Sequence, residues 1–290
     1  MKNIKRNAVI LAAGTASRFV PLSAEIPKGL LEVKGEILIE RQIRQLMEAG
    51  IEDITVVVGY KAEMFQYLKH KFGVQIVINE DYDKYNNTSS IIRVLDKLSN
   101  TYICSSDNYF PENVFIGEPI QSYYSALYAD GLTGEYCLTL DVDDNIIDVK
   151  VGGQDSWYMV GHVYFNNEFS SAFCNIIKLE YENDETKLGY WEDVYIRYIH
   201  QLPLMKVNHY NMHEIEEFDS IDELRKFDDS YFYNTRSSII KNISNHLGCT
   251  ESELSNFTRQ KHGGDYLLFT FLKGEDVYQY NEQNQIIMKI

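Results

Sequence analysis

The stretch Ala8–Val33, AVILAAGTASRFVPLSAEIPKGLLEV, joins an apolar run to an open, basic loop. The run Ala8–Ala13 is typical of a strand that is buried on both faces of a parallel sheet. It is followed by Gly14, by small residues, and then by the cations Arg18 and Lys28. Glycine lets a backbone approach a ligand closely, and cations attract a polyanion. The loop therefore predicts a site for the phosphates of a nucleotide, and the alternative is a solvated basic surface loop.

Helical and strand patterns alternate along the next hundred residues. The predicted helices are Ile37–Ala49, Ala62–Phe72 and Thr88–Leu98, and the predicted strands are Asp53–Gly59, Val74–Ile78 and Thr101–Ser106. Such alternation indicates parallel strands joined by right-handed crossovers, so the fold class is α/β with a Rossmann-like open mixed sheet. Ligands bind beyond the carboxyl ends of the strands in such sheets, and Gly14 and Asp107 both lie just past a strand end.

The pattern becomes rich in strands after about residue 120. Antiparallel strands are predicted at Glu135–Leu140, Ile146–Val151 and Trp157–Phe165, which we expect to form a lid over the crevice. Further elements follow as helices at Asn167–Tyr181, Trp191–His200 and Ile221–Phe227, with strands at Leu204–Val207 and Met212–Phe218. We expect residues 1–230 to form one domain and residues 231–290 a small α+β appendage. In that appendage the sequence predicts a helix over Thr235–Leu247 and strands at Tyr266–Leu272, Asp276–Tyr280 and Gln285–Ile290.

The composition excludes several classes of function. A net charge of −16 argues against a nucleic-acid partner. The apolar runs are too short to cross a bilayer, so no membrane partner is expected. The opening MKNIKRNAVILAAG is interpreted as a first strand rather than a signal peptide, which predicts a cytoplasmic protein. Four widely spaced cysteines without a CxxC pair suggest neither a zinc site nor a disulfide framework.

The string LAAGTASRFVPLSAEIPKGL, Leu11–Leu30, closely resembles the signature of the nucleotidyltransferase family that includes sugar-nucleotide pyrophosphorylases. That signature is a glycine-rich loop, an arginine, and then P-L-[ST]-x-x-x-P-K-[AGP]-L, whereas the G-K-[ST] of a P-loop is absent. Ala16 departs from the pattern, because many members have glycine there. Within the family the chain is most similar to bacterial CTP:phosphocholine cytidylyltransferases over about residues 7–228. The segments that carry this resemblance are VVVGYKAEMFQYLKHKFGVQIVIN, YDKYNNTSSI, SSDNYF, GYWEDVY and EEFDSIDELRKF.

The resemblance implies transfer of CMP from CTP to phosphocholine, giving CDP-choline and pyrophosphate, with Mg²⁺ as cofactor. The implied catalytic residues are Arg18, Lys28 and Asp107. The implied metal ligands are Asp107, Asp219 and Glu217, and Glu217 would share a face with Asp219 if Glu214–Phe218 is a strand. From position alone Asp107 could be a loop or capping carboxylate, and Asp219 could be the N-cap of the following helix.

The resemblance also implies which residues bind the nucleotide. These are Leu11, Ala12, Ala13 and Gly14 in the glycine turn, with Asn87, Thr88 and Ser89 near the base and ribose. The amides and hydroxyls of the second group could hydrogen-bond to cytosine. Helix capping by Thr88 or Asn87 is the alternative, and both roles can hold together.

A quaternary ammonium offers no N–H group, so proteins hold it in aromatic cages with carboxylates nearby. The run Tyr190-Trp191-Glu192-Asp193 supplies such groups, and Tyr136 stands where relatives commonly carry Trp. With 22 Tyr and 14 Phe in the chain, an aromatic cluster could also be plain core. Phosphoethanolamine or 2-aminoethylphosphonate would fit a similar pocket.

Two rival functions stay open at this point. One is a sugar-1-phosphate nucleotidyltransferase, which the YWED segment disfavours, and the other is an inactive nucleotide-binding regulatory protein. The tail Phe257–Ile290 faintly resembles the opening hairpins of choline-kinase-like N-lobes and ends before any kinase catalytic loop. Several hypotheses for this tail stay open: it could be a packing appendage, a remnant, a regulatory module, or a dimerisation element that would make a homodimer.

Overall fold

The computed structural model describes residues 5–263 and 266–290, and the two tail residues Gly264 and Asp265 lie outside this description. The chain packs into two compact units. The first unit comprises Met1–Gly14 and Ile39–Glu217, and the second comprises Thr15–Leu38 and Phe218–Ile290. The loop that carries Arg18 and Lys28 therefore groups with the C-terminal part of the chain. The division into domains at residue 230 stays a prediction.

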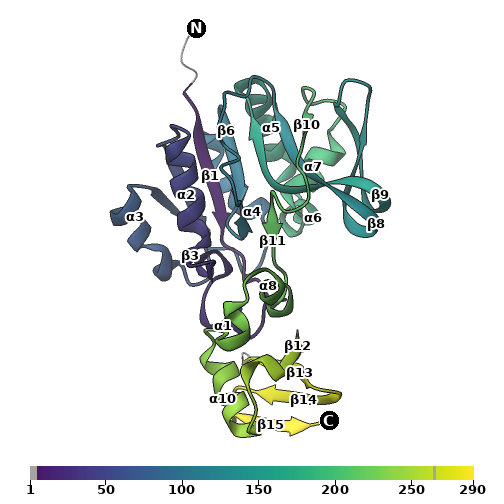
Figure 1. The fold of residues 1–290 in the computed structure, drawn as a ribbon. Coiled ribbons are helices and arrows are strands. Elements are labelled where there is room, and N and C mark those ends of the chain that lie inside the picture. The colour runs from purple at the N-terminus through teal and green to yellow at the C-terminus, as the bar shows by residue number, and fades with distance from the viewer. Residues whose placement is uncertain (1–4, 264–265) are drawn as a thin grey trace. The chain divides into compact units, whose positions relative to one another are not determined.

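A seven-stranded mixed sheet forms the centre of the first unit (Figure 1). Its strand order is β10-β8-β9-β6-β1-β4-β5. Strands β1, β4, β5 and β6 pair in parallel, β9 runs antiparallel to β6 and β8, and β10 is parallel to β8. The strands span Asn7–Ala12 (β1), Ile54–Val58 (β4), Gln75–Ile78 (β5), Thr101–Ser105 (β6), Tyr123–Leu140 (β8), Ile146–Phe165 (β9) and Lys206–His209 (β10). The predicted α/β mixed sheet is confirmed.

The central strands are apolar because both faces of the sheet are covered. All five residues of β4 are buried, as are Val9 and Ile103 in the neighbouring strands. One helix, α2 (Leu38–Glu48), buries Ile39, Ile43 and Leu46 and ends before Gly50, whose φ of +76° closes the helix. Helices α5 and α7 contribute Phe169, Phe173, Trp191 and Tyr195 to the main core cluster. The helical segments of the first unit are α2, η2 (Ala62–Phe65), α3 (Tyr67–Phe72), α4 (Thr88–Ile91), η3 (Ile92–Lys97), α5 (Asn167–Glu180), α6 (Asp184–Leu188) and α7 (Trp191–Arg197).

Strands β8 and β9 differ from the three separate strands that the sequence predicts. They form one long antiparallel ribbon that continues the central sheet, rather than a separate layer. The glycines in this region predict turns between separate strands. Gly131 and Gly152, with φ of +95° and +79°, instead lie inside the paired strands, where the register shifts at bulges.

Three other predicted elements are shorter or broken. The strand expected at Met212–Phe218 is reduced to β11 (Glu216–Glu217), which pairs with β7 (Asn108–Tyr109). The helix expected at Ala62–Phe72 begins with the 3₁₀ turn η2. The helix expected at Thr88–Leu98 changes from α4 to η3, where Val94 leaves the helical region.

The second unit contains the basic loop and the C-terminal appendage. Its sheets are β2 (Glu32–Val33) with β3 (Glu36–Ile37), and the four antiparallel strands β12 (Leu254–Arg259), β13 (Leu268–Lys273), β14 (Asp276–Asn281) and β15 (Ile286–Lys289). Its helical segments are α1 (Leu22–Glu25), η1 (Lys28–Leu30), α8 (Ile221–Phe227), α9 (Ser230–Tyr233), α10 (Ser238–Leu247) and η4 (Glu251–Glu253). The predicted α+β character of the appendage is confirmed, and β12 was missed because its apolar residues are few.

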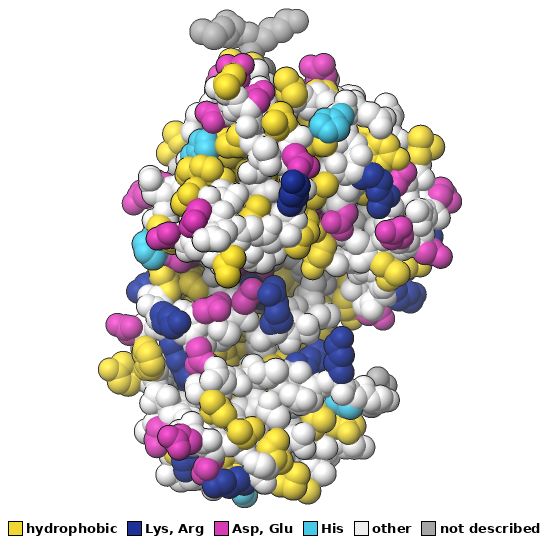
Figure 2. All heavy atoms as spheres, turned by 90° about the vertical axis from the view of Figure 1, so that its right-hand side faces the viewer, with side chains coloured by type: hydrophobic (Ala, Val, Ile, Leu, Met, Phe, Trp, Pro, Cys, Tyr) yellow, Lys and Arg dark blue, Asp and Glu magenta, His cyan; other side chains and the backbone are white. Residues whose placement is uncertain are grey.

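The surface carries charges of both signs. Figure 2 shows Lys and Arg side chains interspersed with Asp and Glu on the face turned to the reader, although acidic residues outnumber basic ones by 43 to 27 in the chain. Within residues 5–263 and 266–290, every helix is too short or too polar to cross a membrane.

Candidate active site

The carboxyl ends of β1 and β6 lie side by side, as the sequence predicts. Leu11 is opposite Ser105 in the parallel ladder, and the backbone N–H of Ser106 donates to the Leu11 carbonyl at 3.1 Å. Ala12 and Ala13 are buried, whereas Gly14 is exposed at the end of the turn. A Cβ added at Gly14 would meet no described atom within 4 Å, so the turn leaves open space at this point. That space lies at the strand edge where such sheets bind their ligands.

Gly59 holds the other side of this turn. It follows β4, and an added Cβ would lie 2.5 Å from Tyr82 Cβ and 3.0 Å from the Ala13 carbonyl oxygen. The next residue, Tyr60, donates its backbone N–H to the same carbonyl at 3.1 Å. Glycine is required here because the Tyr82 side chain and the Ala13 carbonyl approach too closely for a further side chain to fit. Sequence reasoning missed this glycine.

Asp107 lies in the turn between β6 and β7. Its carboxylate is half-buried and accepts a hydrogen bond from Ser105 Oγ at 2.5 Å. The next residue, Asn108, is opposite Glu217 in the β7–β11 pair, and its Nδ2 lies 3.4 Å from Glu217 Oε2. The structure thus brings the predicted metal ligand Glu217 to the strand that follows Asp107.

Gln42 fixes the turn that carries Asp107. This side chain of α2 is 1% exposed, and its Nε2 donates at 2.8 Å to the carbonyls of Ser105 and Asn108. Sequence reasoning missed Gln42. Its position four residues after Leu38 and four before Leu46 places it in the apolar stripe of the helix, and a polar residue there was the available signal.

The two predicted cations meet Asp219 within the second unit. Arg18 Nη1 lies 3.0 Å from Asp219 Oδ2, and Lys28 Nζ lies 3.5 Å from Asp219 Oδ1. The Lys28 side chain is only 8% exposed, whereas that of Arg18 is 77% exposed. A buried ammonium that keeps its charge needs such a carboxylate. Asp219 is not the helix cap: Ser220 caps α8, and its side chain accepts from the N–H of Glu223.

Ala16 adopts a backbone conformation that suits glycine. Its φ is +46°, in the left-handed region that a residue with a Cβ adopts at a cost. The N–H of Phe19 donates to its carbonyl at 2.9 Å, which closes the turn that contains Arg18. The departure from the family pattern therefore retains the backbone conformation that glycine would adopt.

The predicted base-binding segment is engaged within the protein. Thr88 and Ser89 are fully buried, with Thr88 Oγ1 donating to the Gly189 carbonyl and Ser89 Oγ to the Asn86 carbonyl, both at 2.7 Å. We correct the prediction for these two hydroxyls, because each is buried and already bonded. Asn87 lies at the N-cap position of α4 without a side-chain cap bond. Its Oδ1 instead accepts from the N–H of Trp191 at 2.8 Å, and its role toward the base stays a prediction.

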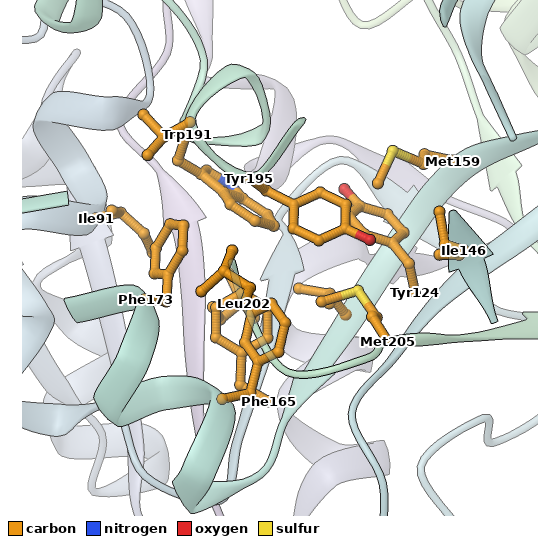
Figure 3. Packing of buried hydrophobic residues seen from close by; sticks show 14 of the residues in the cluster. Ile91, Tyr124, Ile146, Met159, Phe165, Phe173, Trp191, Tyr195, Leu202 and Met205 are labelled. Atoms are coloured by element: carbon orange, nitrogen blue, oxygen red, sulfur yellow. The ribbon is translucent and has the colours of Figure 1, made fainter. Parts of the chain in front are cut away.

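Trp191 belongs to the core and not to an open cage. It is 2% exposed, stacks on Tyr124 at a ring separation of 6.0 Å, and meets Phe165 and Phe173 edge-on. Figure 3 shows these rings gathered around it. The prediction that Trp191 contacts the amine is therefore corrected. The apolar surface of the indole is more stable packed among other rings, which was the alternative weighed from the sequence.

The remaining amine-site residues are joined through Asp193. Tyr136 Oη donates to Asp193 Oδ1 at 2.8 Å, and the N–H of Tyr190 donates to Asp193 Oδ2 at 2.7 Å. Burial, together with this hydrogen bond to a carboxylate, raises the pKa of Tyr136 and keeps it neutral. Tyr190 is 46% exposed. An open cavity of about 470 Å³ has Tyr190, Asp193, Glu185 and Arg197 among its lining residues.

Glu192 lies between Trp191 and Asp193 in the segment that was predicted to bind the amine. Burial raises its pKa to about 7, against hydrogen bonds that act to lower it, from Asn87 Nδ2 and Tyr124 Oη, both at 3.2 Å. The neighbouring Asp193 also raises this pKa. A carboxylate that is costly to ionise binds a cation well, because the cation restores the interactions lost on burial.

The acidic residues form no preassembled metal cluster. Across residues 5–263 and 266–290, no three His, Cys, Asp or Glu side chains are grouped closely enough to hold an ion. The predicted ligands are all carboxylates, which is the donor type that Mg²⁺ prefers. Mg²⁺ also commonly uses only one or two carboxylates and takes its other ligands from substrate phosphates and water. The donor set therefore fits Mg²⁺ that arrives with a nucleotide.

Comparison with known proteins places the chain in a family. Residues 8–143 match the MobA-like NTP transferase domain. The chain is 36% identical to 2-aminoethylphosphonate cytidylyltransferase of Lancefieldella rimae, over 80% of this chain and 96% of that one. It is 33% identical to choline-phosphate cytidylyltransferase of Streptococcus pneumoniae, over 77% and 96% of the two chains.

A solved structure agrees with these matches. The structure of CTP:phosphocholine cytidylyltransferase from Streptococcus pneumoniae superimposes with a TM-score of 0.75 at 33% identity, covering 78% of this chain and 99% of that chain. Because that structure is covered almost completely, the part of this chain outside the match is additional to the shared fold. The chain is therefore a nucleotidyltransferase, and it belongs to the family that contains the choline-phosphate and 2-aminoethylphosphonate cytidylyltransferases.

Proposed function

We propose that this protein transfers the cytidylyl group of CTP to phosphocholine, giving CDP-choline and pyrophosphate. The observation that carries the proposal is the cluster of Arg18, Lys28 and Asp219. In it, two cations of the basic loop, residues 15–38, share one carboxylate. We call this segment the signature loop. The names of the two cytidylyltransferase relatives support CTP as the nucleotide. The bond that forms joins an acceptor phosphate oxygen to the α-phosphorus of CTP, and the bond that breaks releases pyrophosphate.

The cations would act on the triphosphate. Arg18 can bind phosphate oxygens with two parallel N–H groups, and Lys28 adds a point charge from a buried position. Negative charge on the leaving pyrophosphate grows during transfer, so fixed positive groups near it lower the barrier. The Gly14 turn would offer backbone N–H groups to the same phosphates.

We propose Mg²⁺ as the cofactor, with Asp107, Glu217 and Asp219 as its protein ligands. When bound, the ion would neutralise phosphate charge and align the reacting groups. Asp219 is paired with Arg18 and Lys28 in this structure. Arrival of the triphosphate would supply those cations with phosphate partners, and the Asp219 carboxylate would become available.

The acceptor amine would bind near Tyr136, Tyr190, Glu192 and Asp193. Tyrosine rings attract a quaternary ammonium by cation–π interaction, and the carboxylates supply opposite charge. One observation favours 2-aminoethylphosphonate as a second candidate. Burial of Trp191 removes the strongest cation–π partner from the predicted cage and leaves a larger share of the recognition to carboxylates, which hydrogen-bond to a primary amine.

We also propose the cytoplasm as the location, because the apolar run at the start of the chain serves as the buried strand β1.

A substrate panel tests the proposed function. Purified protein with Mg²⁺ is given each of the four NTPs with phosphocholine, phosphoethanolamine, 2-aminoethylphosphonate or glucose 1-phosphate, and pyrophosphate release is measured. We expect CTP and phosphocholine to give the highest kcat/KM. Preference for the sugar phosphate would replace the proposal by a sugar nucleotidyltransferase, and CTP binding without pyrophosphate release would indicate the regulatory protein.

A further inference from the structure

The signature loop is tied to the C-terminal appendage through Glu25. Glu25 is the last residue of α1 and lies three positions before Lys28. Its carboxylate accepts hydrogen bonds from the hydroxyls of Ser237 and Ser238, and from the backbone N–H of Ser238 at 2.7 Å. These partners are more than 200 positions away in the sequence, at residues 237 and 238.

The position of Glu25 at the start of α10 makes this contact strong. Ser237 is the N-cap of α10, a helix of 10 residues, and its Oγ also accepts from the N–H of Ile240 at 3.0 Å. The first N–H groups of a helix lack partners within the helix, and the helix dipole is positive at this end. A carboxylate accepts hydrogen bonds from these N–H groups, and its negative charge interacts favourably with the positive end of the dipole. Hydrogen bonds to an ionised acceptor are also stronger than those between neutral groups.

The appendage also holds the loop on the other side of Lys28. Tyr231, which is fully buried, donates its hydroxyl to the carbonyl of Glu32 at 2.8 Å. Arg236 Nη2 lies 3.1 Å from Glu32 Oε1, and the N–H of Lys34 donates to Asp228 Oδ2 at 2.7 Å. Residues before and after Lys28 are therefore both attached to the segment 228–238.

The appendage is attached to the helix after Asp219 as well. Arg225 of α8 is 3% exposed and donates at 2.7 Å to the carbonyls of Leu254 and Glu251. Asp222 of the same helix accepts from the N–H of Asn256 at 2.7 Å. The appendage therefore contacts both the loop that carries Arg18 and Lys28 and the helix that follows Asp219.

We propose that residues 228–290 position the signature loop for the nucleotide, with Glu25 and Ser238 as positioning residues. This inference rests on the proposed function, in which Lys28 and Arg18 bind the triphosphate. Without the Glu25 contact, α1 and the turn into Lys28 lose their link to α10, and the buried ammonium of Lys28 is held less firmly. CTP binding should weaken, whereas acceptor binding, which uses residues outside this loop, should be unchanged.

Two variants and a matched control test the positioning role. Glu25→Ala removes the carboxylate at α10, and Glu25→Gln keeps an acceptor without the charge. Glu253→Ala is the control. Glu253 makes an equivalent capping contact within the appendage, accepting from the N–H of Thr250 at 2.7 Å. Among the residues that the structure describes, its hydrogen-bond partner is Thr250 and not a residue of the signature loop. Circular dichroism and thermal unfolding first establish that each variant is folded.

The first measurement is amide hydrogen exchange of residues 15–38, which requires no nucleotide. Exchange in this segment should accelerate in Glu25→Ala, less in Glu25→Gln, and not in Glu253→Ala. The second measurement is the KM and equilibrium Kd for CTP, both of which should rise about ten-fold in Glu25→Ala with the acceptor KM unchanged. Glu25→Gln should recover part of this loss.

The outcomes separate the two proposals. Unchanged exchange of residues 15–38 in a folded Glu25→Ala protein would overturn the positioning role, whatever the enzyme does. Unchanged KM and Kd for CTP in an active enzyme would overturn it as well. If the native protein releases no pyrophosphate with any NTP, the proposed function fails, and the exchange experiment still decides whether the appendage holds the loop.

Discussion

Arg18 Nη1 lies 3.0 Å from Asp219 Oδ2, so an expected phosphate-binding cation and an expected metal ligand neutralise each other. The pair is largely solvent-exposed at Arg18, and exposed ion pairs contribute little to stability. Lys28 shares the same carboxylate from a buried position. The arrangement keeps the polar groups of the loop compensated until a nucleotide is present.

The first prediction concerns Asp219. Asp219→Asn removes the negative charge and should lower kcat/KM about 100-fold, because charge stabilisation in the transition state is lost. The free energy of unfolding should also fall, by about 1–3 kcal/mol, because the buried ammonium of Lys28 loses its carboxylate partner. Steady-state kinetics and urea unfolding measure the two effects. Asp229→Asn, a neutralisation at an exposed residue after α8, serves as control and should leave kcat/KM unchanged. Near-native activity in Asp219→Asn would remove this carboxylate from the mechanism.

The second prediction is a pH effect through Glu192. Its pKa is raised from 4.5 to about 7, so it is neutral below pH 7 and ionised above. An ionised Glu192 attracts an ammonium group, and the acceptor KM should therefore fall as the pH rises through about 7. Glu192→Gln should remove this component and keep only the titration of the acceptor phosphate, which is common to both proteins. Identical pH profiles for the two proteins would exclude Glu192 from amine binding.

The same shift predicts how stability depends on pH. Because the pKa of Glu192 is higher in the folded than in the unfolded chain, its favourable contribution is complete below about pH 4.5 and is lost as the pH rises through about 7. Glu192→Gln should therefore unfold with less pH dependence than the native chain between these values. Urea titrations at several pH values measure the difference.

The third prediction separates the two neighbouring aromatic residues. Trp191→Ala should lower the free energy of unfolding by about 3–5 kcal/mol, because it empties a site among Tyr124, Phe165 and Phe173. Tyr190→Ala removes a half-exposed ring and should change stability by less than about 1 kcal/mol while raising the acceptor KM. Chemical denaturation and acceptor kinetics give the comparison. A stable Trp191→Ala enzyme with altered acceptor choice would restore the aromatic cage predicted from the sequence.

The fourth prediction is that Gly59 tolerates no side chain. Gly59→Ala would place a methyl group 2.5 Å from Tyr82 Cβ and 3.0 Å from the Ala13 carbonyl oxygen, so Tyr82 and the turn after β4 must move apart. We expect a loss of about 1–3 kcal/mol in stability and a higher KM for CTP, because Gly14 follows Ala13 directly. Gly134→Ala is the matched control, since a Cβ there meets no described atom within 4 Å. Equal behaviour of the two variants would contradict this packing argument.

The fifth prediction concerns Ala16. With φ at +46°, alanine is strained at this position and glycine is not. Ala16→Gly should therefore raise the free energy of unfolding by up to about 1 kcal/mol, although glycine also gains freedom in the unfolded chain. Thermal unfolding measures the change. A clear loss of stability would show that the turn does not need the left-handed conformation.

Much of the fold could be predicted from the sequence because its signals are local. The buried β-branched run of β4 and the apolar spacing of α2 ending at Gly50 each indicate their element without reference to the rest of the chain. The ribbon of β8 and β9 could not be predicted in full. Its glycines occur both in turns and at bulges, and only the pairing of distant strands distinguishes the two.

The candidate site was predictable where a motif specifies it. Arg18, Lys28 and Asp219 do meet in the structure, and Gly14 and Asp107 do follow neighbouring strands. Trp191 and Thr88 were misjudged because sequence alone does not show which side of a helix faces the core. Gln42 was missed because its role depends on contacts with residues far away along the chain.

The hydrogen bonds between Glu25 and residues 237 and 238 set an order for biosynthesis. During translation the signature loop is synthesised early. Its contacts with residues 237 and 238 can form only after most of the chain has been synthesised, because closing so long a segment must await the later residues. A chain released before residue 237 would contain the family signature, Leu11–Leu30, but would lack α10, the helix that Glu25 contacts.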